Sequence, residues 1–103
     1  MATIAARRVR PPYVAPDTLD GLRGPSRGVL TLPIHIHWSP QRDFDLGDPG
    51  QAAVAYGSII READEQEQTE LLDRQLLLDL WPDLFLPDWL KRLWESRFPE
   101  LGR

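Results

Sequence analysis

Proline is the residue that most limits what this chain can fold into, because ten of its 103 residues are proline. Proline lacks a backbone N–H, and within a helix it is tolerated only in the first turn. In the second half of the chain, prolines at positions 49, 82, 87 and 99 break up every stretch that has helical character. This half is therefore predicted to be a set of short helices rather than one long helix.

The helix boundaries can be predicted from capping residues. Asp48 followed by proline is typical of a helix start, and a helix is expected over about 49–63. A leucine-rich stretch over about 66–80 is also predicted to be helical, and Asp73 offers an N-cap midway, so a division into two helices with a bend stays open. A last helix is predicted from Pro87 to Phe98. The apolar face of the first helix is Ala52, Tyr56, Ile59, Ile60 and Ala63.

The segment 30–38 has a different pattern, in which apolar and other residues alternate. Its apolar positions are Leu30, Leu32, Ile34, Ile36 and Trp38. A period of two predicts an extended strand with one buried face, and Pro33 restricts it to an edge. No second strand is evident, so we expect the segment to lie across the helices or to join the sheet of a partner protein.

Residues 1–28 are rich in Arg, Pro and Gly, and we expect an extended, disordered basic arm there. Residues 29–103 are expected to form one small helical domain that includes the extended segment at 30–38. The predicted fold class is mainly α: a small bundle of three to four short helices, preceded by a partly disordered arm and one strand-like segment.

The composition excludes several classes of protein. The chain has no cysteine, which excludes a disulfide framework and thiol chemistry. No apolar run approaches the roughly 20 residues of a membrane-spanning helix. The first ten residues place their arginines after the apolar positions, unlike a signal peptide. We therefore expect a cytoplasmic protein, and nothing in the pattern calls for a cofactor.

Charge is distributed unevenly along the chain. Residues 1–30 carry five arginines and two aspartates, whereas residues 31–103 carry seven basic and fourteen acidic side chains. An acidic body favours a basic protein partner over duplex nucleic acid. Glu65, Glu67 and Glu70 belong to a run of acids without a basic residue, and we predict that they contact such a partner.

Aromatic residues are concentrated between positions 81 and 98. A domain of this size cannot bury all of them, so each is open to a place in the core or in an interface. Four of them are predicted to bind a protein partner together with the acids: Trp81, Phe85, Trp89 and Trp94.

Two alternative functions rest on other residues. Arg7, Arg8 and Arg10 would serve a nucleic-acid-binding transcriptional regulator. His35 and His37, at a spacing of two, would begin a metal site or a metal-dependent enzyme, although such a site needs a third ligand. The simpler interpretation is that both histidines form the polar face of the strand. We predict no metal and no catalytic residue, since no nucleophile triad or phosphate loop is present.

Several short motifs resemble a family of small actinobacterial proteins whose genes commonly lie beside nucleotidyltransferase toxins of the abortive-infection (AbiEii) type. The motifs are Phe44-Asp-Leu46, Tyr56 with Ile59-Ile-Arg-Glu62, Leu76-Leu-Leu-Asp-Leu-Trp81, and Leu84-x-Leu-Pro87 with the helix to Trp94. The resemblance covers roughly residues 32–98. It implies a cognate antitoxin or accessory subunit that binds and restrains a nucleotidyltransferase acting on RNA, and it implies no specific contact residue.

Overall fold

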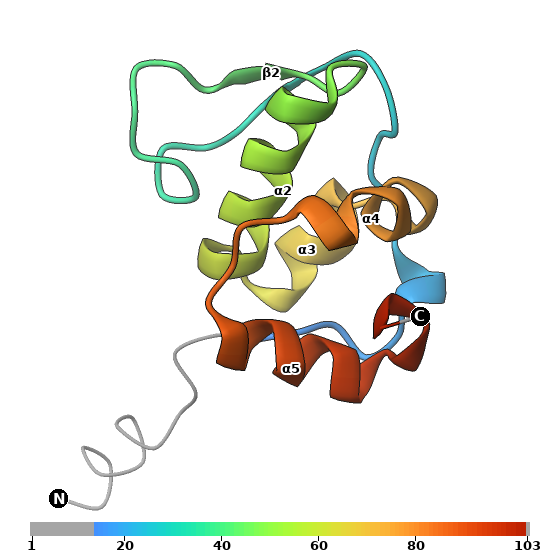
Figure 1. Ribbon diagram of the computed structural model, residues 1–103. Helices are drawn as coiled ribbons and strands as arrows, with labels where there is room; N and C mark the ends of the chain where they lie inside the picture. The colour runs from blue at the N-terminus through green and yellow to red at the C-terminus, as the bar shows by residue number, and fades with distance from the viewer. Residues whose placement is uncertain (1–13, 103) are drawn as a thin grey trace, which may run out of the picture.

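The computed structural model describes residues 14–102. Within them lie four α-helices: α2 (Pro49–Glu62), α3 (Glu65–Leu71), α4 (Arg74–Leu80) and α5 (Asp88–Arg97). Two short strands, β1 (Val29–Thr31) and β2 (Asp43–Asp45), form an antiparallel sheet. In Figure 1 this sheet lies at one end of α2 and α5 at the other. The predicted mainly α class is confirmed. No helix between residues 14 and 102 has the length and apolar character that crossing a membrane requires.

The helix α2 forms the centre of the fold. Its N-cap is Asp48, whose carboxylate accepts a hydrogen bond from the Gly50 N–H at 2.9 Å, and Pro49 occupies the first turn. The helix predicted over 49–63 is therefore confirmed to within a residue at its end. Its predicted inner face, with Tyr56 and Ile59, is fully buried.

The leucine-rich stretch is divided into two helices at Asp73. The Asp73 carboxylate accepts from the Leu76 N–H at 2.9 Å and so caps α4, so that of the two alternatives left open the division into two helices is the one observed. The Asp73 N–H in turn donates to the Tyr56 hydroxyl oxygen at 2.9 Å, which fixes the start of α4 against α2. Burial of this hydroxyl raises the pKa of Tyr56 to about 12.

The C-terminal aromatic residues build the other half of the core. After α4 a 3-10 turn (Trp81–Asp83) contains Pro82, and a connector over 84–87 leads to α5. The rings of Trp81 and Trp94 stack with their centroids 6.2 Å apart, and Phe98 meets Trp94 edge-on at 5.5 Å. A last 3-10 turn (Pro99–Gly102) follows α5, at the proline expected to end the helix.

The prediction of one long strand over 30–38 is wrong. The strand β1 ends at Thr31, and the chain then turns, because the carbonyl of Pro33 accepts from the N–H groups of Ile36 and His37 at 3.0 and 3.1 Å. A second strand, unseen in the sequence, pairs with β1 in the register Val29↔Asp45, Leu30↔Phe44 and Thr31↔Asp43. Leu30, Leu32 and Ile36 are buried as predicted, whereas Ile34 and Trp38 are exposed.

The described part of the predicted arm is ordered against the helices, which differs from the expectation of a disordered arm over 1–28. Leu19, in the 3-10 turn Leu19–Gly21, is buried in the core. The N–H groups of Arg23 and Gly24 donate to the carbonyls of Thr69 and Leu72 at 2.9 and 2.8 Å. Apolar burial and these backbone hydrogen bonds offset the entropy of ordering the segment. Residues 1–13 lie outside the described residues.

Candidate docking surfaces

The acids predicted to bind a partner lie on α3, and their roles differ. Asp64 and Glu67 form a capping box, in which the side chain of each accepts from the backbone N–H of the other. Glu67 also pairs with His35, whose Nε2 lies 2.6 Å from its Oε2. Glu67 is therefore engaged within the fold, whereas Glu65 and Glu70 are exposed.

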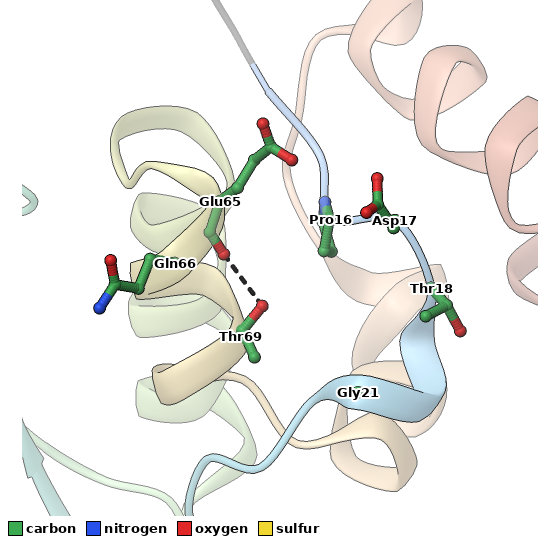
Figure 2. Close-up of a pocket in the computed structure, with 7 residues that line it drawn as sticks. All are labelled: Pro16, Asp17, Thr18, Gly21, Glu65, Gln66 and Thr69. Carbon is green, nitrogen blue, oxygen red and sulfur yellow. Dashed lines mark hydrogen bonds between the residues drawn. The ribbon is translucent and has the colours of Figure 1, made fainter.

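A hollow of about 280 Å³ lies between α3 and the segment 16–21. Figure 2 shows Glu65 and Thr69 on one wall and Asp17 on the other. The Thr69 hydroxyl donates to the carbonyl of Glu65 at 3.0 Å and is thereby turned toward its own helix. Two carboxylates from segments far apart in the sequence thus border one small hollow.

The charge of the described residues reinforces this acidic character. All sixteen carboxylate side chains of the chain lie within residues 14–102, but four of its twelve basic residues, Arg7, Arg8, Arg10 and Arg103, lie outside them. Of the pair that borders the hollow, Asp17 forms an exposed ion pair with Arg97 at 3.5 Å, and Glu65 forms none with any described residue. Glu65 is therefore the carboxylate of this hollow that no described basic side chain pairs with.

The prediction that four aromatics face a partner needs correction for two of them. Trp81 and Trp94 are 2% and 0% exposed, because they stack on each other in the core. The Trp81 Nε1–H donates to the Glu95 carboxylate at 2.9 Å, while the Nε1–H of Trp94 is buried without a hydrogen-bond partner. Trp89 is half-exposed on α5, and Phe85 is 95% exposed on the connector.

Phe85 borders a second hollow, on the outer face of α2. This hollow of about 220 Å³ is bordered by Asp83 and Phe85 on the connector side, by His37, and on α2 by Ala53, Val54, Gly57, Ser58 and Arg61. A further hollow of about 440 Å³ also includes Arg61 and Phe85 in its lining, so the two adjoin. We call the surface defined by the eight residues of the smaller hollow the α2 groove. It shares no residue with the hollow beside α3.

The groove owes its shape to small residues and to one hydrogen bond. Ala53 has a small side chain, the Arg61 guanidinium lies over the buried Gly57 with Nη1 3.2 Å from where a Cβ would be, and Val54 is half-exposed. The Arg61 guanidinium donates from Nη1 to the carbonyl of Phe85 at 3.3 Å, which joins the end of α2 to the connector. The Phe85 ring consequently stands out from a backbone that is held in place.

The two histidines weighed as metal ligands have separate partners. His35 pairs with Glu67, and the Nδ1 of His37 lies 2.8 Å from the Ser58 hydroxyl. Across residues 14–102 no group of three or more His, Cys, Asp or Glu side chains is arranged to hold a metal ion. Each histidine therefore fastens the turn after β1 to a helix, His35 to α3 and His37 to α2.

Sequence reasoning missed one exposed apolar cluster. Ile34 and Trp38, assigned to the buried face of a strand, line a hollow of about 260 Å³ with Arg42, and Trp38 is 85% exposed. The signal available was Pro33, which interrupts the alternation. The arginines of the nucleic-acid alternative, Arg7, Arg8 and Arg10, lie outside the described residues.

Comparison of the chain with models of protein families, with curated proteins and with solved structures found no match.

Proposed function

We propose that this protein is an antitoxin-like accessory protein that binds a nucleotidyltransferase and restrains it by placing the acidic face of α3 on a basic surface of that enzyme. The observation that carries this proposal is the hollow between α3 and the segment 16–21, bordered by the carboxylates of Glu65 and Asp17. The resemblance described above supplies the class of the partner.

Electrostatics supports a basic partner. Glu65 and Glu70 are exposed and have no basic residue beside them in the sequence of α3. A carboxylate-lined hollow of about 280 Å³ has room for the end of a Lys or Arg side chain from another protein. The excess of carboxylates in residues 14–102 would also raise the rate of encounter with a positively charged surface.

The mode of restraint follows from the chemistry of the partner. An enzyme that binds RNA needs Lys and Arg side chains to neutralise phosphates. An acidic helix that occupies those side chains competes with RNA for the same positive surface. Binding would then lower the activity of the nucleotidyltransferase without any catalytic group on this chain.

The test is co-expression with a nucleotidyltransferase encoded next to this chain. We expect a complex that survives size-exclusion chromatography in low salt, and nucleotide transfer to RNA that falls as the complex forms. The double variant Glu65→Gln and Glu70→Gln should weaken binding, measured by calorimetry, and flatten its salt dependence.

A matched control keeps the change in net charge the same. The exposed Asp43 on β2 and Asp79 on α4 border neither the α3 hollow nor the α2 groove, so their replacement by Asn should leave binding nearly unchanged. Separate elution of the two wild-type proteins at micromolar concentration would refute the proposal. Equal weakening by both double variants would refute the assignment to α3.

A further inference from the structure

The α2 groove carries two pairs of complementary features on one small surface. One pair is steric: the exposed Phe85 projects beside a hollow whose α2 side includes Ala53 and Val54. The other is electrostatic: Arg61 and Asp83 border the same hollow with opposite charges. A surface that holds both a feature and its complement is what an isologous two-fold contact requires.

We propose that the α2 groove pairs with the α2 groove of a second copy of this chain, so that the protein forms a two-fold symmetric dimer. In this arrangement the Phe85 ring of each protomer lies in the hollow of the other. Arg61 of each protomer faces Asp83 of its partner, and both contacts occur twice.

The steric part of the proposal is consistent with the dimensions of the groove. An apolar cavity of about 150 Å³ in a protein is sufficient to bind benzene, which has the size of a phenyl ring. The hollow beside Ala53 measures about 220 Å³, so it has the volume for a Phe85 ring from a second copy, although His37, Ser58, Arg61 and Asp83 also line it. A phenylalanine that is 95% exposed in the single chain gains more burial from such a contact than any other exposed apolar residue of the groove.

The electrostatic part rests on charges that are not satisfied within one chain. Arg61 donates only to the neutral carbonyl of Phe85, and neither Arg61 nor Asp83 forms an ion pair with a described residue. A two-fold axis through the groove brings each charge opposite its complement. If the groove instead met a partner surface of one charge sign, a basic surface would repel Arg61 and an acidic surface would repel Asp83.

The symmetry of the contact also sets the size of the assembly. The projecting ring and the hollow belong to one surface, so both are buried when two chains pair. No such surface is left for a third copy, and the assembly closes at two. This inference is separate from the proposed function, since the α2 groove contains none of the carboxylates of α3. A dimer would present two acidic faces.

The first experiment measures mass as a function of concentration for the full chain, by sedimentation equilibrium. We expect the wild-type protein to dimerise, and Phe85→Ser to raise the dissociation constant by at least about tenfold. Trp38→Ser is the matched control, because Trp38 is a similarly exposed aromatic outside the groove. It should leave the dissociation constant unchanged.

The second experiment exchanges the charges. In R61D two carboxylates face each other across the axis, and in D83R two guanidinium groups do, so each variant alone should be monomeric. An equimolar mixture of R61D and D83R should form a heterodimer, because both cross-axis pairs are then opposite in sign. The double variant R61D/D83R should dimerise by itself. Circular dichroism establishes that each variant is folded, and Phe85→Ser tests the interface independently of any effect of R61D on the connector.

Three results would overturn the dimer. One is a wild-type protein that stays monomeric to millimolar concentration. Another is a dimer that Trp38→Ser disrupts and Phe85→Ser does not. The third is a mixture of R61D and D83R that stays monomeric although both variants are folded. A wild-type protein that dimerises but does not bind the nucleotidyltransferase would instead count against the proposed function alone.

Discussion

The guanidinium of Arg61, in the last turn of α2, donates a hydrogen bond to the carbonyl oxygen of Phe85 at 3.3 Å, across 24 positions of sequence. This contact joins the central helix to the connector that precedes α5. It holds the most exposed aromatic residue of the described chain in a defined place.

Replacement of Arg61 by Met should release the connector while keeping most of the aliphatic side chain. Because the bond is long and partly exposed, we expect a loss in the free energy of unfolding of less than about 1 kcal/mol. Amide hydrogen exchange of residues 84–87 should rise clearly. Arg92→Met, on the exposed side of α5, is the control, and an equal rise in both variants would contradict the role given to Arg61.

Tyr56→Phe removes the acceptor of the Asp73 N–H without changing the volume of the core. A buried donor left without a partner should lower the free energy of unfolding by about 1–3 kcal/mol, as measured by urea denaturation. The loss of stability should be accompanied by unfolding of α4, because Asp73 is the N-cap of that helix. A variant as stable as the wild type would show that water replaces the hydroxyl.

The same hydroxyl predicts how stability depends on alkaline pH. Burial raises the pKa of Tyr56 from its ordinary value of 10.0 to about 12 in the folded chain, so the unfolded chain loses this proton first. The contribution of Tyr56 is complete below pH 10 and declines as pH rises toward 12. The denaturation midpoint should fall over this range in the wild type and fall less in Tyr56→Phe. Parallel pH profiles would contradict the prediction.

Gly24→Ala should detach the N-terminal segment from α3. A Cβ at this position collides with the backbone of Leu71 and Leu72, whereas a Cβ at Gly21 meets nothing within 4 Å. We expect Gly24→Ala to cost about 1–3 kcal/mol in thermal or urea unfolding, and Gly21→Ala to cost far less. The reverse order would mean that the segment 14–24 does not dock as described.

Truncation of Trp94 should lower stability far more than truncation of Phe85. Trp94→Ala opens a cavity between Trp81 and Phe98 and should cost about 3–5 kcal/mol. Phe85→Ala removes an almost fully exposed ring and, in the monomer, should change stability by no more than about 0.5 kcal/mol. Similar losses in urea denaturation would contradict the division into core and surface.

The helices could be predicted from the sequence because their signals are local. Asp48 and Asp73 each cap a helix through a backbone N–H two or three residues away, and such contacts depend little on the remainder of the fold. Prolines ended or opened helices where expected. The acidic character of α3 could also be predicted, because it needs only the order of residues.

The parts that could not be predicted depend on distant contacts. The alternation of Asp43, Phe44 and Asp45 is too short to predict a strand, and β2 is defined by its pairing with β1, in which Leu30 lies opposite Phe44. Apolar periodicity likewise does not distinguish Trp94 in the core from Phe85 on the surface, since both belong to the same aromatic run. The α2 groove arises where α2 meets the connector, and no motif in either segment indicates it.

The docking of the N-terminal segment on α3 has a consequence for synthesis of the chain. The Gln68 side chain donates from Nε2 to the carbonyl of Val14 at 3.0 Å, a contact between residues 54 positions apart. At roughly 5–20 residues per second, a ribosome adds those positions in roughly 3–11 s. During that interval Arg23 has no Thr69 carbonyl to bind, so the segment 14–24 reaches its native place only after α3 has been made.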